Sequence, residues 1–353
     1  MRFLKRIMLC LLIILLYDDV AIAQEGIVNT KMLAAKQTFE AWYKAYDVEN
    51  GKGFWDQAEM IEGVLDAYEV TKDPMYIARF NKLYRNFIAS NKEDWMYNDF
   101  NDDITWAVLF CVRGYNFTGN KAYLLKTKDQ FDKMYARAYT KSYGGGLIWK
   151  EKKTSKNACI NGPAMVACCY LAEATGDEGY YNKAVDLYKW SKIYLFDPKT
   201  GKVNDGIDMD DNTQKITTFE WSSTYNQGTF MGAAILLYKH TKNLTYLNDA
   251  KKMAGYIKDT MYKGQVMNNE VGGDDLPGFK GIFVRYARSY MLETKEQTFT
   301  DWMLLNARTA YENRNSLGLI HTKWATKTPE GKPESAFGGS TAVSLLMNTL
   351  PFN

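Results

Sequence analysis

The sequence predicts an all-α fold: an (α/α)6 barrel, in which six inner helices and six outer helices form a double ring. Apolar residues recur at helical spacing along most of the 353 residues, and the alternation typical of strands is nearly absent. A short polar turn that follows a threonine also recurs, with a helical pattern on each side of it. A repeated unit with connections of variable length indicates a closed ring or a solenoid. An open right-handed solenoid is the alternative to the barrel.

The N-terminus is interpreted as a signal peptide that covers residues 1–23. Its first six residues include three basic ones, residues 7–16 form an apolar run too short to span a bilayer, and small residues precede a cleavage site at Gln24. No later segment is apolar enough to cross a membrane. We therefore expect 24–353 to be a single exported catalytic domain, periplasmic or extracellular, that is monomeric and does not insert into a membrane.

Twelve helical patterns follow one another along the rest of the chain. They alternate in a fixed order: a helix, a short turn, a second helix and then a longer loop. Their approximate ranges are 30–45, 54–70, 74–90, 102–116, 120–138, 160–174, 178–194, 221–240, 243–261, 278–292, 296–313 and 336–349.

The short turns share one pattern, in which a threonine is followed by polar residues and then by an aromatic residue that opens the next helix. The five turns contain Thr71, Thr118, Thr175, Thr241 and Thr294. The helix before each turn begins with small residues, so we assign it to the crowded inner ring. The longer loops then gather at one end of the ring, beside the N-termini of the inner helices. Because loops on a rigid scaffold commonly carry function, we expect the binding cleft at that end.

Composition excludes several classes of protein. The net charge is +3 without a basic stripe, so nucleic acid and anionic lipid are poor candidates for partners. With only His240 and His321, the chain can build neither a histidine triad nor a zinc site with several imidazoles. We therefore expect no metal and no cofactor. Four cysteines remain after cleavage and are interpreted as buried thiols, although one disulfide stays open; they are Cys111, Cys159, Cys168 and Cys169.

Carboxylate chemistry is the chemistry that remains, and Asp102 and Asp103 are its candidates. They lie at the start of a predicted inner helix, in the segment NDFNDDITWAVLF. Aspartates also occur at this position as caps, which is the structural alternative. Neighbouring carboxylates can enter one cleft a few ångströms apart, and retaining glycosidases hold theirs at roughly 5–5.5 Å. A catalytic pair here would therefore favour a retaining double displacement.

Other clusters of amides, hydroxyls and aromatic residues fall at equivalent loop ends. The segments NACING (157–162), TFEWSSTYNQG (218–228) and GFKGIFVRY (278–286) each open an inner helix. Such side chains can hydrogen-bond and stack a polyhydroxylated ligand, although each could instead cap or pack a helix. The acidic segment 204–212 lacks the residue order of a calcium loop.

Taken together, these segments resemble glycoside hydrolase family 76, the endo-α-1,6-mannanases, which share an (α/α)6 barrel. The resemblance is carried by the aspartate pair, by GLIWK followed by NACINGPAMVACCYLAEATGDEGYYNKA, by FEWSSTYNQGTFMGAAILLYKHTKNLTYL and by GFKGIFVRYA. It covers roughly residues 30–349. It implies cleavage of α-1,6-linked mannan with Asp102 as nucleophile and Asp103 as general acid/base.

The same resemblance places further residues around the cleft as substrate-binding candidates, with Trp55 as either a further platform or a core residue. These candidates are Asn101, Trp149, Asn161, Asp205, Trp221, Tyr225, Asn226, Gln227, Lys280 and Phe283. Three alternatives stay open: a mannan transglycosylase of the same fold, another (α/α)6 enzyme acting on uronides or epimerising sugars, and a non-catalytic mannan-binding protein.

Overall fold

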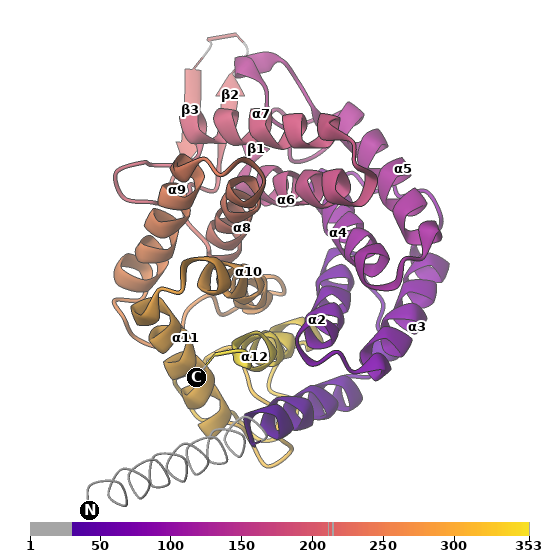
Figure 1. Ribbon diagram of the computed structural model, residues 1–353, viewed down its shortest axis with the longest axis vertical. Helices are drawn as coiled ribbons and strands as arrows, with labels where there is room; N and C mark the ends of the chain where they lie inside the picture. The colour runs from indigo at the N-terminus through magenta and orange to yellow at the C-terminus, as the bar shows by residue number, and fades with distance from the viewer. Residues whose placement is uncertain (1–29, 211, 214, 353) are drawn as a thin grey trace, which may run out of the picture.

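Residues 30–210, 212–213 and 215–352 are described by the computed structural model. In this part of the chain, helices form two concentric rings (Figure 1). The predicted signal peptide, 1–23, lies outside the described residues. Within them, no helix is both long enough and apolar enough to cross a membrane.

The inner ring consists of the five helices that the threonine turns follow and of the last helix of the chain. Each contacts the next, and the last contacts the first, so the ring closes and the open solenoid is excluded (Figure 1). These helices are α2 (Trp55–Thr71), α4 (Asn101–Thr118), α6 (Ala158–Thr175), α8 (Thr224–Thr241), α10 (Phe279–Thr294) and α12 (Ala336–Thr349).

The outer ring contains the first helix of the chain and the second helix of each of the five hairpins that a threonine turn joins. It comprises a helix over 30–45, α3 (Pro74–Asn91), α5 (Lys121–Ala138), α7 (Glu178–Tyr194), α9 (Leu244–Gly255) and α11 (Gln297–Glu312). A π-helical turn, Tyr256–Met261, continues α9. The prediction of an (α/α)6 barrel is confirmed, with the helix ends within a few residues of their expected positions.

Burial separates the two rings. Helix α2 is buried without interruption from Gln57 to Ala67, because neighbours surround an inner helix on every side. Helix α3 buries only Tyr76, Phe80, Leu83 and Phe87, which recur every three or four residues and form one stripe. The inner ring is thus a rigid, packed support for whatever lies at its ends.

Each threonine turn has a defined geometry, of which Thr71 is an example. Its hydroxyl donates to the carbonyl of Ala67 (2.6 Å) and accepts the backbone N–H of Asp73 (3.2 Å). Between them, Lys72 adopts a left-handed conformation (φ 56°) that ends the helix. Asp73 then caps the next helix by accepting the N–H of Met75. The same two threonine hydrogen bonds recur at Thr118, Thr175, Thr241 and Thr294.

One small antiparallel sheet departs from the all-helical expectation. It has the order β1–β2–β3, formed by β1 (Lys156–Asn157), β2 (Gly206–Asp210) and β3 (Lys215–Phe219). The segment 204–212, interpreted from sequence as an acidic loop, therefore contains a strand. Strands β2 and β3 form a hairpin that projects beyond the rim of the ring (Figure 1).

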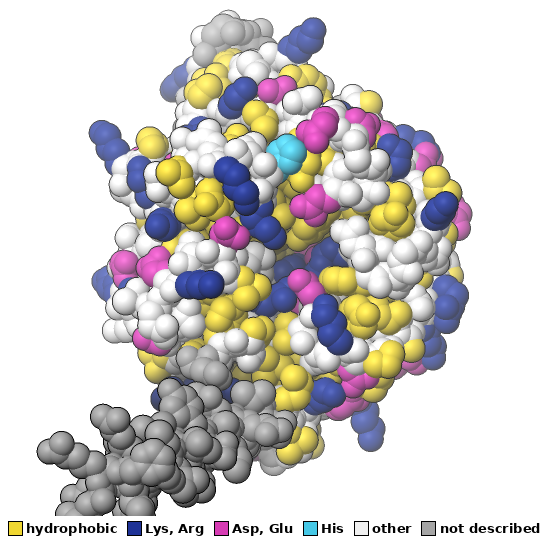
Figure 2. Space-filling model, in the orientation of Figure 1, with side chains coloured by type: hydrophobic (Ala, Val, Ile, Leu, Met, Phe, Trp, Pro, Cys, Tyr) yellow, Lys and Arg dark blue, Asp and Glu magenta, His cyan; other side chains and the backbone are white. Residues whose placement is uncertain are grey.

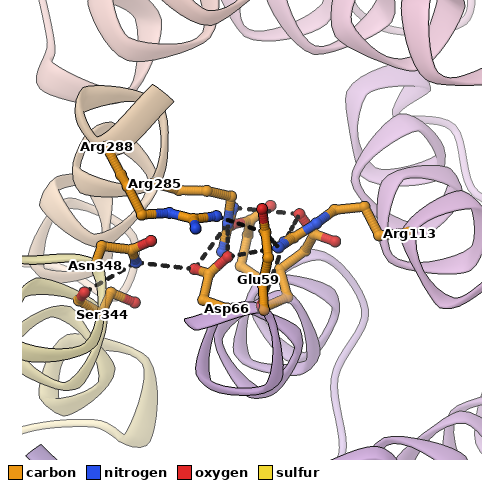
Figure 3. Close-up of polar contacts among 9 residues, drawn as sticks. Glu59, Asp66, Arg113, Arg285, Arg288, Ser344 and Asn348 are labelled. Atoms are coloured by element: carbon orange, nitrogen blue, oxygen red, sulfur yellow. Dashed lines mark hydrogen bonds and ion pairs between the residues drawn. The ribbon is translucent and has the colours of Figure 1, made fainter. Parts of the chain in front are cut away.

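Buried ion pairs hold the centre of the ring. Asp66 of α2 is fully buried and accepts from Arg113 of α4 (2.8 Å) and from Arg285 of α10 (3.0 Å), which approach it from opposite sides (Figure 3). Asn348 of α12 adds a third contact at 3.3 Å. Acidic and basic side chains show in the hollow at the centre of the face seen in Figure 2. The first inner helix is thereby joined to the second and to the last two.

Candidate active site

A cleft of about 590 Å³ opens at the end of the barrel where the inner helices begin. Six first-turn residues of the inner helices line it: Trp55, Asp102, Asp103, Cys159, Tyr225 and Phe279. Loop and sheet residues complete the wall, among them Trp149, Asp205 and Trp221. The predicted position of the cleft, beside the longer loops, is confirmed.

The aspartate pair lies in the first turn of α4 but does not cap it. The cap position is Phe100, where no side chain accepts a helix N–H. Asp103 instead accepts a hydrogen bond from the side-chain amide of Asn98 (2.9 Å, Nδ2 to Oδ2). Asp102 Oδ1 is buried and has no hydrogen-bond partner among the described residues. An unpartnered buried oxygen is costly, so capping does not account for the pair.

Burial and mutual repulsion keep protons on the pair. Burial raises the pKa of Asp102 well above its ordinary value, and the neighbouring charge of Asp103 raises it further. Burial also raises the pKa of Asp103, to about 6, although the Asn98 amide opposes the shift. Burial therefore favours the protonated form of both carboxyls.

Three more carboxylates make the cleft acidic. Asp205 accepts from the Asn226 amide (3.0 Å), and Asp275 accepts from the indole N–H of Trp55 (3.2 Å). Asp208 completes this set of lining residues. Lys153 is the one basic residue among the described side chains that line the cleft. No group of three or more His, Cys, Asp or Glu residues in the described chain is arranged to hold a metal ion.

Aromatic rings surround the pair. Tyr225 and Phe279 stack with their centroids 3.9 Å apart, and Trp106 stands 6.3 Å from Tyr225. Trp221 lines the cleft and is 49% exposed, so its indole is accessible to a ligand. Carboxylates among open aromatic faces match the two sides of a sugar ring, its hydroxyls and its apolar face.

Six of the twelve predicted site residues line the cleft, and Trp55 does so as well. The six are Asp102, Asp103, Trp149, Asp205, Trp221 and Tyr225. A seventh, Asn226, stands behind the wall and holds Asp205 in place.

Two predicted residues, Asn101 and Asn161, support the wall instead of lining it. The Asn101 amide donates to the carbonyl of Ile148 (3.0 Å) and accepts from Arg137 (2.9 Å). The Asn161 amide accepts the N–H of Leu147 (2.9 Å) and donates to its carbonyl (3.1 Å). Both side chains are fully buried, and these bonds fix the loop that carries Trp149.

The other three, Gln227, Lys280 and Phe283, are also fully buried and absent from the cleft wall. Gln227 donates to the carbonyl of Gly201 (3.1 Å). Lys280 donates to backbone carbonyls, including that of Asn269 (3.0 Å). Phe283 packs in the core. Each of the three stabilises loops or packing behind the site, and a direct role in sugar binding stays a prediction.

Several lining residues were not among the predicted ones. They are Phe100, Trp106, Lys153, Ser155, Asn157, Cys159, Asp208, Phe219, Asp275 and Phe279. Most of them fall in segments that the sequence singled out, and Phe279 is an immediate neighbour of Lys280. The signal that could have found Phe279 is its place in the first turn of an inner helix, the level at which the cleft lies.

Paired carboxylates in an aromatic cleft, at the loop end of an (α/α)6 barrel, define a glycoside hydrolase. The sequence model of glycosyl hydrolase family 76 matches residues 27–351, and the chain belongs to that family.

The similar proteins of known structure include the GH76A α-1,6-mannanase from Salegentibacter sp. HEL1_6. It is 31% identical, with a TM-score of 0.82, over 91% of this chain and 99% of that one. An inactive variant of the same enzyme, substituted at two consecutive aspartates, is solved in complex with α-1,6-mannotetrose, with a TM-score of 0.82.

Curated relatives are more distant. The mannan endo-1,6-alpha-mannosidase DFG5 of Saccharomyces cerevisiae is 27% identical over 79% of this chain and 67% of that protein. The corresponding DCW1 protein of Candida glabrata is 27% identical over 53% of this chain and 45% of its own length. The matches thus span about half to two thirds of these relatives.

Proposed function

We propose that this protein is an endo-acting, retaining α-1,6-mannanase that cleaves mannan backbones by double displacement at Asp102 and Asp103. The observation that carries the proposal is the position of the two neighbouring carboxyls in the cleft, where neither caps the helix. The Salegentibacter α-1,6-mannanase, inactive when two consecutive aspartates are replaced, supports the same chemistry.

In the first step, Asp102 attacks the anomeric carbon and forms a mannosyl ester while Asp103 protonates the departing glycosidic oxygen. In the second step, Asp103 removes a proton from water, which attacks the ester and releases the sugar with its configuration retained. Asp103 must begin protonated because it donates a proton to the departing oxygen, and Asp102 must begin ionised because it attacks as a carboxylate.

The substrate itself supplies the means to place the proton correctly. Asp102 Oδ1 has no hydrogen-bond partner within the described part of the chain. A mannosyl hydroxyl that donates to this oxygen stabilises the ionised form of Asp102 and lowers its pKa. The single proton of the pair then resides on Asp103, which becomes the acid.

Product analysis on unbranched α-1,6-mannan tests the proposal, with Asp102→Asn and Asp103→Asn as variants. We expect short manno-oligosaccharides from the wild type and almost none from either variant. If the wild type binds the polymer but leaves it intact, the protein is a non-catalytic mannan-binding protein and not a hydrolase. Products longer than the substrate would show transfer to a sugar acceptor in place of water.

The two roles can be separated with a substrate whose leaving group needs no proton. In an aryl α-mannoside of an acidic phenol, the phenolate departs without protonation by a general acid. Asp103→Asn should therefore still form the mannosyl ester and release phenol in a burst, whereas Asp102→Asn should release none. The reverse pattern would exchange the two roles.

Export is the second part of the proposal, and it rests on the N-terminal sequence alone. A mature chain that begins at Gln24 and is recovered from the periplasm or the medium is the expected result of N-terminal sequencing. A full-length chain retained in the cytoplasm would contradict it.

A further inference from the structure

The β2–β3 hairpin continues the wall of the cleft outward. Asp208 on β2 and Phe219 on β3 both line the cleft, although neither belongs to the helical ring. Thr154, in the loop that precedes β1, donates to Asp208 (2.8 Å) and ties the hairpin to that loop, whose Lys153 and Ser155 also line the cleft. The hairpin is therefore attached to the site and not merely adjacent to it.

The register decides which side chains share the face that looks into the cleft. Asp208 pairs with Thr217, and Gly206 pairs with Phe219. Cross-strand partners lie on the same face, and alternate residues along each strand do so as well. The cleft-facing side therefore comprises Asp208, Asp210, Lys215, Thr217 and Phe219.

The opposite face is different in character. Ile207, which pairs with Thr218, is fully buried, so this face packs against the barrel at its base. Further out, Ile216 is 38% exposed. The hairpin is thus anchored through one face, while the other presents polar groups and one aromatic ring.

The cleft-facing side has the chemistry that recognises a sugar chain. Every residue of β3 is exposed, so the amine of Lys215 and the hydroxyl of Thr217 are accessible to a ligand. Phe219 is 38% exposed and offers a ring face near the cleft. From Asp208 to Asp210 the strand advances by about 7 Å, which extends this polar surface beyond the cleft mouth.

We propose that the cleft-facing side of the β2–β3 hairpin binds further mannosyl units of the same chain whose scissile bond lies at the aspartate pair. The inference rests on the proposed function, since the occupant is α-1,6-mannan. It makes the hairpin a determinant of chain length: long chains reach this surface, and short oligosaccharides held at the pair do not.

Two matched double variants test the inference, because β3 presents alternate residues to opposite faces. The first, Thr217→Ala with Phe219→Ala, truncates two side chains on the cleft-facing side. The second, Ile216→Ala with Thr218→Ala, truncates two side chains on the other face of the same strand. Both pairs are exposed, so neither change opens a cavity in the core. Affinity is measured by calorimetry in the inactive Asp103→Asn protein, with unbranched α-1,6-mannan and α-1,6-mannotetraose as ligands.

We expect the cleft-facing variant to weaken binding of the polymer by roughly 10-fold, the size of one or two lost hydrogen bonds or stacking contacts. Binding of the tetraose should fall by a much smaller factor, and the variant of the opposite face should behave as its parent. Equal losses for both ligands, equal effects of both variants, or no effect of either would overturn the inference.

The same experiment separates this inference from the proposed function. The wild type could cleave no mannan while only the cleft-facing variant loses affinity for the polymer. In that case the inference about the hairpin holds and the proposed hydrolase activity does not. If the wild type cleaves mannan and the two double variants bind the polymer equally well, the proposed hydrolase activity holds and the inference about the hairpin does not. A protein that binds no manno-oligosaccharide contradicts both.

Discussion

The side-chain amide of Asn98 donates a 2.9 Å hydrogen bond to Oδ2 of Asp103, the carboxyl proposed as general acid/base. This bond favours the ionised form of Asp103 and opposes the effect of burial on its pKa. Asn98 lies in the loop before α4, so a residue outside the helix sets how readily the acid gives up its proton. A pH profile can measure this influence.

Replacing Asn98 with Ala should move the basic limb of the pH profile of kcat/KM to higher pH. The reason is that the lost donor leaves the ionised form of Asp103 less stable, and the pKa rises by about 0.5–1 unit, the worth of one hydrogen bond. Asn86→Ala is the control, because its amide donates to the carbonyl of Glu49 instead of to a cleft residue. A profile that shifts to lower pH, or shifts equally in the control, would contradict the assignment.

Asp103→Asn should stabilise the folded protein at neutral pH while it abolishes turnover. The folded pKa of about 6 lies above the ordinary 3.8, so the folded state binds more protons than the unfolded state between these values. Stability therefore falls as pH rises from about 4 to 6, and above 6 the full penalty is present. The amide removes a penalty of about 1–3 kcal/mol.

The measurement is the melting temperature at pH 4 and at pH 7.5 for the wild type and Asp103→Asn. The variant should melt a few degrees higher at pH 7.5, and the difference should shrink at pH 4, where the wild-type carboxyl is protonated. A variant less stable than the wild type at pH 7.5 would show that the carboxylate is not under electrostatic strain.

Asp205→Ala should raise KM for manno-oligosaccharides more than it lowers kcat. Asp205 lines the cleft and is held by the amide of Asn226 (3.0 Å), an arrangement suited to accept a hydrogen bond from a sugar hydroxyl. Because one charge-assisted hydrogen bond to the sugar is lost, we expect KM to increase by roughly 10-fold. Asp197→Ala, an exposed aspartate outside the cleft wall, is the control for acidic charge alone. A selective fall in kcat would move Asp205 into the chemistry.

Asp66→Asn should destabilise the fold by about 3–5 kcal/mol, because it removes the charge that two buried arginines share. Although burial alone would raise it, Arg285 and Arg113 hold the pKa of Asp66 below its ordinary value. Glu40→Gln is the matched control, since its ion pair with Arg79 is at the surface and contributes about 0–1 kcal/mol. Urea unfolding measures both variants. Similar midpoints would show that the central ion pairs do not hold the ring together.

Local signals explain why the helices could be predicted from sequence. The threonine turn combines a left-handed residue at the helix end with a cap for the next helix, and residues such as Thr71 and Asp73 mark both. The hairpin escaped prediction because its strands are five residues each and β3 is exposed throughout, so no apolar alternation marks it. Only the pairing of β1 with β2 joins segments that are distant in sequence.

The site was predictable to the level of the segment but not always of the side chain. A motif identifies the element that reaches the cleft, and the direction of each side chain then follows from helix geometry. Phe279, in the first turn of α10, lines the cleft, whereas Phe283, one turn or about 6 Å deeper, lies in the core. Buried amides such as Asn161 resemble sugar-binding residues in sequence, because both uses require the same donors and acceptors.

The most direct test of the central claim is a proton NMR time course of an α-1,6-linked manno-oligosaccharide with the wild type, Asp102→Asn and Asp103→Asn. The account predicts that the wild type first releases the α-anomer at the new reducing end, with the β-anomer appearing only by later mutarotation, and that neither variant turns over at a comparable rate. A first-formed β-anomer, or undiminished turnover by either variant, would contradict double displacement at Asp102 and Asp103.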